Sequence, residues 1–157
     1  MTNSAASRNV HAADLARAFE LASRLVHSRS HACGLYPAQW SALRYLKMAT
    51  GEYRTAMALA RYQGLAFGPV ARTVRTLIER GFLRKAGSAG RGRAEVVELT
   101  AAGEEILARD PLAPLVLALA ALDPAARSAF AVALEPILEA LAGAGEAEGP
   151  GNSPKND

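Results

Sequence analysis

The sequence offers little from which a disulfide or a membrane span could be built. It has one cysteine among 157 residues, so no disulfide can form within the chain, as is typical of proteins in a reducing cytosol. Its longest strongly apolar run, residues 115–122, is much shorter than the about 20 residues that cross a bilayer. The first residues contain no apolar segment of the kind found in signal peptides. We therefore expect a cytoplasmic protein without a membrane partner.

Residues for catalysis or for a resident metal are also scarce. His27, His31 and Cys33 form the pattern H-x3-H-x-C, and histidines four residues apart share a helix face that is compatible with metal binding. No other cluster supplies the remaining ligands, unless a dimer partner does. Cys33 is the candidate redox thiol, and no nearby acid orients a histidine beside it for catalysis. We predict no enzyme, no metal and no required cofactor, and keep a metal, haem or thiol sensor as an alternative.

Acidic residues are nearly missing from one segment. Residues 54–93 contain nine Lys or Arg and a single acid, Glu79. The formal net charge of +3 hides this asymmetry, because residues 1–110 carry +7 and residues 111–157 carry −4. A local basic block is typical of a nucleic-acid-binding surface, although solvated positive faces are also common.

The residue pattern predicts a mainly α fold with a small β-hairpin. Glycine, proline and capping residues mark the ends of the segments. Two short strands follow Gly81, and a flexible glycine loop lies between them. The expected helices cover 12–31, 37–49, 55–62, 68–80, 100–110 (or, with a kink, 100–122) and 124–142, the strands cover 82–85 and 95–99, and a disordered tail covers 143–157.

The helix written GPVARTVRTLIER, residues 68–80, is amphipathic. Val70, Val74 and Leu77 recur at helical spacing and form an apolar stripe. Arg72 and Arg75 fall on the opposite side, where little acid is present to pair them. The face is either plainly solvated or built to meet an anion. A helix–turn–helix followed by a hairpin is the layout of a winged helix, in which this helix and the hairpin loop meet DNA.

Four stretches, taken together, resemble the MarR family of winged-helix transcription regulators. They are LYPAQWSALRYL (35–46), TAMALA (55–60), RTVRTLIERGFL (72–83) and RGRAEVVELTAAG (91–103), and the resemblance covers about residues 35–108. It implies a homodimer, a palindromic DNA operator and often a small-molecule effector. It also implies a winged helix-turn-helix domain at 35–103, flanked by dimerisation helices at 1–34 and 104–142, with the tail at 143–157. The expected function is that of a sequence-specific regulator, most simply a repressor released by a small-molecule or redox signal.

The resemblance and the basic block together predict the DNA-binding residues. Arg72 matches a recognition-helix arginine of the family, and Arg93 matches the wing-tip arginine that enters the minor groove. The sequence departs from the family at Ala66 and Pro69, where hydroxyl residues are usual, and at Arg91, where an acid is usual. The residues expected to contact DNA are Arg72, Arg75, Thr76, Gly68, Arg91, Arg93, Arg54 and Arg61.

Aromatic residues near the first two helices are candidates for an effector pocket. Phe19, His31, Tyr36 and Trp40 combine flat apolar surfaces with polar atoms, which suits an amphipathic ligand. Trp40 is equally compatible with a place in the core. A winged-helix module that binds another protein remains the second hypothesis for function, and an exposed apolar patch in place of the basic face would favour it.

Overall fold

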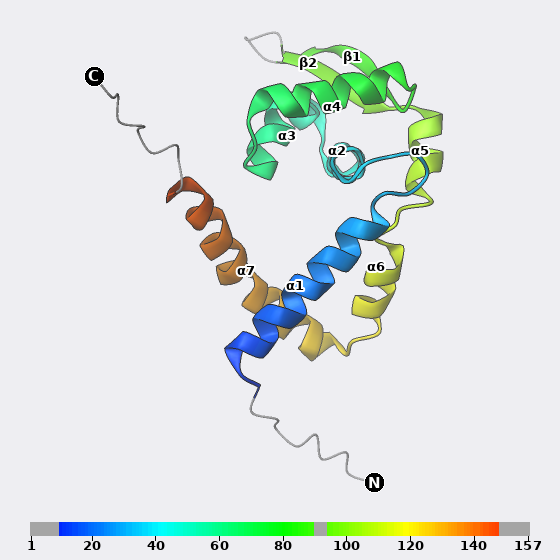
Figure 1. Cartoon of the computed structure of the whole chain (residues 1–157). Coiled ribbons are helices and arrows are strands. Elements are labelled where there is room, and N and C mark those ends of the chain that lie inside the picture. The colour runs from blue at the N-terminus through cyan, green and yellow to red at the C-terminus, as the bar shows by residue number, and fades with distance from the viewer. Residues whose placement is uncertain (1–9, 90–93, 148–157) are drawn as a thin grey trace, which may run out of the picture.

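The computed structural model describes residues 10–89 and 94–147. Within these ranges the chain forms seven α-helices, a short 3-10 turn and one antiparallel hairpin (Figure 1). No helix in the described ranges is long and apolar enough to cross a membrane. The elements are α1 (Ala12–Arg29), α2 (Pro37–Met48), the 3-10 turn (Gly51–Tyr53), α3 (Ala56–Gln63), α4 (Phe67–Glu79), β1 (Leu83–Ala89), β2 (Ala94–Leu99), α5 (Ala101–Leu107), α6 (Ala113–Ala120) and α7 (Pro124–Ala147).

The buried core belongs to the winged-helix part. Helices α2, α3 and α4 pack against one another, and the hairpin covers α2 and α4. This arrangement confirms the fold class expected from the sequence. The largest fully buried side chains are Trp40, Leu43, Leu46, Leu59, Leu77, Leu83 and Val97.

Local signals in the sequence set the ends of the central elements. The hydroxyl oxygen of Thr55 accepts a hydrogen bond from the N–H of Ala58 and so caps α3. Gly64 ends α3 in the left-handed conformation, with φ of 62°. Thr100 caps α5 through the N–H of Gly103 and donates its own hydroxyl hydrogen to the carbonyl of Gly81. One threonine therefore joins the end of the hairpin to the turn after α4.

Several segment ends differ from the sequence-based expectation. The first strand continues to Ala89 instead of ending at Lys85, so much of the expected glycine loop is strand. The register shifts between Lys85 and Ser88, and Gly87 adopts a φ of 104° there, which fits a β-bulge. Helix α7 continues to Ala147, so the tail expected from residue 143 was placed too early. Helix α5 ends at Leu107, before the shorter of the two expected ends, and residues 108–112 separate it from the new helix α6, so the kinked continuation to residue 122 does not form.

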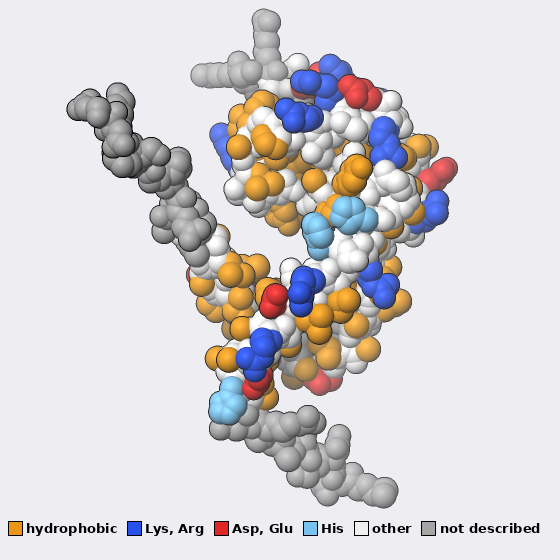
Figure 2. Space-filling model, in the orientation of Figure 1, with side chains coloured by type: hydrophobic (Ala, Val, Ile, Leu, Met, Phe, Trp, Pro, Cys, Tyr) orange, Lys and Arg blue, Asp and Glu red, His pale blue; other side chains and the backbone are white. Residues whose placement is uncertain are grey.

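Helices α1, α6 and α7 form a second part with a different surface. They lie below the winged helix in the view of Figure 1, and none of their described side chains is buried. On the face seen in Figure 2, apolar side chains gather over the α7 and α6 region, whereas charged side chains lie along α1. The large exposed apolar residues of the three helices are Leu15, Phe19, Leu21, Leu25, Leu115, Val116, Leu117, Phe130, Val132, Ile137, Leu138 and Leu141.

A partly buried ion pair between Arg44 and Asp110 joins the two parts. The guanidinium of Arg44 on α2 donates two hydrogen bonds, of 2.8 and 2.7 Å, to the carboxylate of Asp110. The same carboxylate accepts the N–H of Leu112, just before α6. Burial alone would raise the pKa of Asp110, but the hydrogen bonds from Arg44 and Leu112 and the positive charge of Arg44 hold it below its ordinary value.

Candidate nucleic-acid interface

Helix α4 separates an apolar face from a basic face, as the sequence pattern indicates. Val70, Val74 and Leu77 are buried against the core. Arg72 and Arg75 are exposed on the other side, and Thr76 is half-buried at the border between the faces. Neither arginine forms an ion pair or a side-chain hydrogen bond with a described residue. Their charge therefore remains available to an outside partner.

Other basic residues of the segment 54–93 are engaged within the protein. Arg84 on β1 pairs with Glu98 directly opposite on β2, with 2.6 Å between Nη2 and Oε2. Lys85 pairs with Glu95 at 2.8 Å. Both acids lie just beyond the segment in which the charges were counted, so the count overstated the free positive charge. The strand register supplies partners that the sequence window misses.

Arg80 and Arg54 bind backbone carbonyl groups. Arg80 donates from Nη1 to the carbonyl of Gly34 at 2.7 Å, and its guanidinium carbon lies 5.1 Å from the ring centre of Phe82. Arg54 donates from Nε to the carbonyl of Ala49 at 2.8 Å. Arg54 also lies beside Glu98 and Glu104 in a small cleft near α5.

Arg61, Arg72 and Arg75 remain as the free basic set. We use this name for the described arginines of residues 54–93 that make no ion pair or side-chain hydrogen bond with a described residue. Arg61 is exposed on α3, the helix that packs against α4. Figure 2 shows Lys and Arg side chains gathered over the winged-helix part, with others along α1.

No atom of the described chain blocks a partner molecule from approaching the start of α4 at Gly68. A Cβ atom added at Gly68 would meet no atom within 4 Å, and the residue is exposed. Ala66 at the N-cap position provides no side-chain hydrogen bond, so the first N–H groups of α4 have no side-chain cap. This agrees with the loss of hydroxyl groups noted in the sequence. Arg91 and Arg93, expected at the wing tip, lie outside the described residues.

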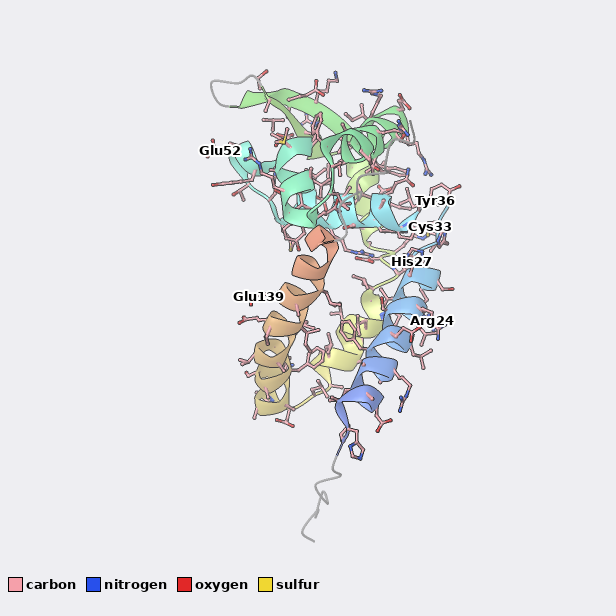
Figure 3. The ribbon with its side chains drawn as sticks, turned by 60° about the vertical axis from the view of Figure 1, so that its left-hand side comes forward. Arg24, His27, Cys33, Tyr36, Glu52 and Glu139 are labelled. Atoms are coloured by element: carbon pink, nitrogen blue, oxygen red, sulfur yellow. The ribbon has the colours of Figure 1, made fainter. Side chains whose placement is uncertain are left out.

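The residues expected to line an effector pocket divide into separate places. His31 lies 5.4 Å from His27 and 5.8 Å from Tyr36, measured between ring centres with the rings edge to face. Figure 3 shows His27, Cys33 and Tyr36 at the junction of α1 and α2. Phe19 lies farther back on α1 and is 39% exposed. The structure therefore gathers His27, His31 and Tyr36, which we call the junction cluster.

Trp40 belongs to the core. Its side chain is fully buried, and its indole N–H has no hydrogen-bond partner among the described residues. Trp40 therefore lies in the core of the winged helix, which was the alternative to a place in the effector pocket.

Cys33 is exposed in the turn after α1, with a φ of 55°. Within residues 10–89 and 94–147, no three His, Cys, Asp or Glu side chains gather in a way that could hold a metal ion.

Three tyrosines form a feature that the sequence analysis missed. Tyr45, Tyr53 and Tyr62 surround a hollow of about 280 Å³ together with Met48, Ala49 and Thr50. Their spacing of eight and nine residues spans two helices and a turn, so helical periodicity does not connect them. The end of α2, the 3-10 turn and the end of α3 bring them together in space.

Comparison with known proteins gives matches in structure only. No family model matches the sequence, and no curated protein matches it either. The transcriptional regulator PA3341 aligns with a TM-score of 0.62 and 23% identity, over 81% of this chain and 94% of that one. MepR of S. aureus, in a complex with DNA, aligns with a TM-score of 0.64 and 14% identity, over 86% and 99%.

A third solved structure carries the family name. The MarR family protein Rv2887 of Mycobacterium tuberculosis, in a complex with salicylic acid, aligns with a TM-score of 0.55 and 22% identity, over 83% of this chain and 98% of that one. Each of the three alignments covers more than four-fifths of this chain. The chain therefore has the fold of MarR-type winged-helix transcriptional regulators.

Proposed function

We propose that the protein is a homodimeric, sequence-specific DNA-binding regulator of transcription, controlled by a small molecule. The observation that carries the proposal is the free basic set. Two of its members lie on the exposed face of α4, and the other lies on α3. Neighbouring basic residues of the segment have partners within the chain, whereas these three make no ion pair or side-chain hydrogen bond with a described residue.

The chemistry of arginine suits this face to DNA. An arginine in the major groove can bond the O6 and N7 atoms of guanine in a bidentate way, which discriminates among bases by about 1–3 kcal/mol. Arg72 is the residue that we assign to base reading, and Arg75 and Arg61 are assigned to phosphates. Phosphate contacts fix register and add salt dependence without reading sequence. MepR, which shares the fold, is known in a complex with DNA.

The second part of the chain supports the homodimer. Helix α7 is 24 residues long, and none of its described side chains is buried. Leu138 and Leu141 on α7 and Val116 and Leu117 on α6 are more than half exposed. Exposed apolar surface on this scale marks an interaction face. A second copy of the chain would cover it and place two α4 helices on one duplex.

The proposed site for a small-molecule effector is the junction cluster. The junction cluster joins the start of α2 to α1, so a ligand there would contact both parts of the chain. Rv2887, with the same fold, is known in a complex with salicylic acid. We assign repression relieved by such a ligand as the simplest mode of action.

The test starts from selection of duplexes out of a random library with the purified full chain. We expect a palindrome whose half-sites lie about 10 bp apart, centre to centre. Fluorescence anisotropy on the selected and a scrambled duplex then compares three variants. Arg72→Ala should reduce the preference for the selected duplex by roughly 5- to 150-fold. Arg61→Ala should weaken both duplexes alike and lower the salt slope by about one.

Arg109→Ala is the matched control. Arg109 is exposed on the turn after α5, and its side chain makes no hydrogen bond or ion pair with a described residue. The variant removes the same charge away from α4 and should leave both affinities unchanged. If Arg72→Ala and Arg109→Ala behaved alike, α4 would not be the reading element. If no duplex were enriched, the proposed function would be wrong.

A further inference from the structure

The hollow lined by Tyr45, Tyr53 and Tyr62 lies apart from the junction cluster, and its Tyr62 follows Arg61 directly on α3. Tyr45 is on α2, Tyr53 ends the 3-10 turn and Tyr62 is on α3. Glu52, which marks this turn in Figure 3, is on the opposite side of the winged helix from Cys33 and Tyr36. The hollow, which we call the tyrosine hollow, is therefore separate from the junction cluster.

The floor of the tyrosine hollow is fixed. The side chain of Tyr45 is buried, and its hydroxyl donates to the carbonyl of Tyr53 at 3.0 Å. Burial raises the pKa of Tyr45, and the nearby Tyr62 and Tyr53 raise it further, so the hydroxyl keeps its hydrogen at neutral pH. The carbonyl of Ala49, another lining residue, already accepts a hydrogen bond from Arg54. The shape of the floor is thus set before any ligand arrives.

The walls, in contrast, are large apolar groups left in water. Tyr53, Tyr62 and Met48 are 61%, 64% and 66% exposed. The ring centres of Tyr45 and Tyr62 lie 4.9 Å apart with a tilt of 40°, so one aromatic pair is already formed. A further flat ring can stack on this pair and contact the thioether of Met48. The exposed rings lose little freedom on binding, because tyrosine has only two rotatable side-chain bonds.

The lining also fixes the charge of the ligand. None of the six lining residues carries a charge at neutral pH. The hydroxyls of Thr50, Tyr53 and Tyr62 form no hydrogen bond with a described residue, so they can meet a polar group at the edge of the ligand. No lining side chain is a cation, and Arg54 contacts the lining through the hydrogen bond from its Nε to the carbonyl of Ala49, which engages that donor. We propose that the tyrosine hollow binds a neutral, planar aromatic molecule of one or two rings with a hydroxyl group.

The size of the hollow agrees with this class. Sites for small molecules usually measure about 300–1,000 Å³, and the tyrosine hollow, at about 280 Å³, lies just below the lower end. The hollow is open to solvent, so a ligand would lie on Tyr53, Tyr62 and Met48 with its other face in water. The site needs neither DNA nor the basic face of α4, so it stands or fails independently of the function proposed above.

The experiment uses 2-naphthol as the probe and the full chain without DNA. Binding is measured by isothermal titration calorimetry and by saturation-transfer difference NMR. We expect 2-naphthol to bind with one site per chain, and 2-naphthalenesulfonate, the anion of the same ring system, to bind at least tenfold more weakly. Tyr62→Ala and Tyr53→Ala should each weaken 2-naphthol binding roughly three- to tenfold, as expected for the loss of one aromatic contact.

Tyr36→Ala is the matched control, because Tyr36 is 65% exposed, like Tyr62 at 64%, and belongs to the junction cluster. It should leave 2-naphthol binding unchanged. Tyr62→Ala removes the ring pair with Tyr45, so circular dichroism measures its thermal unfolding midpoint and establishes that the variant is folded at the assay temperature. Failure of 2-naphthol to bind would overturn the proposal. Loss of binding in Tyr36→Ala with none in Tyr62→Ala would do the same, and would move the ligand to the junction cluster.

Discussion

Gly103 on α5 is the position where a single added methyl group should do most harm. Glycine is buried there, and an ideal Cβ atom would lie 2.2 Å from the carbonyl oxygen of Phe82, closer than real Cβ atoms come to any atom. The same oxygen accepts the N–H of Thr100 at 3.1 Å. The obstacle is backbone, so no side-chain rotation relieves it. Gly103→Ala must move α5 away from the end of the hairpin.

The expected loss follows from three contributions. Forcing a methyl group into a filled space costs about 1–3 kcal/mol. Breaking the hydrogen bond between Thr100 and Phe82 costs about 1 kcal/mol. The higher helix propensity of alanine stabilises the folded chain by about 1 kcal/mol and partly offsets these losses. The net loss in the free energy of unfolding is therefore about 1–3 kcal/mol, which lowers the unfolding midpoint by roughly 3–10 °C for a chain of this size.

Gly143→Ala provides the internal comparison. Gly143 is exposed in α7, and a Cβ atom there would meet nothing within 4 Å. The change should raise stability by up to about 1 kcal/mol, since only helix propensity is altered. Thermal and urea unfolding followed by circular dichroism measure both variants. Equal midpoints for Gly103→Ala and the unmodified chain would refute the close approach between α5 and the turn after α4.

Two further predictions concern the contacts that join segments of the chain. The pKa of Asp110 is lower in the folded chain than in the unfolded chain, where it is near 4, so its carboxylate stabilises the fold above about pH 4 and this contribution is lost as the pH falls through the folded pKa. Asp110→Asn should therefore lower the free energy of unfolding by about 1–3 kcal/mol at pH 7. It should also weaken the dependence of stability on pH at acid pH, measured by unfolding at a series of pH values. If the variant lost stability with falling pH as steeply as the unmodified chain, this carboxylate would not be the cause of that loss. Arg80→Met should lower stability by about 0.5–1 kcal/mol, through loss of the bond to Gly34, and leave the salt slope of DNA binding unchanged. A slope lower by about one would show instead that Arg80 meets a phosphate.

Much of the fold was predictable because short signals in the sequence set it. Thr55, Gly64 and Thr100 act as caps in the structure, as threonine and glycine commonly do at helix ends, and the periodicity of Val70 and Val74 gives the buried face of α4. These features depend only on neighbouring residues. They also place the helix–turn–helix and hairpin in order, which is enough for the fold class.

The errors occurred where a longer-range effect competes with a local one. Glycine and serine at 87 and 88 favour a loop, yet pairing with β2 keeps them in the strand and confines the irregularity to a bulge. Glycine at 143 favours a helix end, yet the alanine and glutamate around it have high helix propensity, and α7 continues past it. In both cases the preference of a single glycine is outweighed by the residues around it or paired with it.

The candidate site shows the same limit in its electrostatics. A charge count over residues 54–93 treats all basic residues alike, whereas the structure sorts them by partner. Arg84 meets a glutamate across the hairpin, and Arg80 meets a backbone carbonyl 46 residues away. Neither partner lies inside the segment that was counted. Only Arg72 and Arg75 were singled out correctly from the helix pattern as exposed residues, because that pattern reports exposure directly.

The chain thus presents two incomplete surfaces of opposite chemistry, and this difference helps in separating their roles. The free basic set calls for an anionic partner, and such contacts weaken as counterions compete for them. The apolar faces of α1, α6 and α7 call for an apolar partner, and burial of such surface does not weaken as salt rises. A fall in DNA affinity with increasing salt therefore reports on phosphate contacts of α3 and α4. Because dissociation of a dimer held by apolar contacts would not follow the same salt dependence, the two steps can be told apart in one titration series.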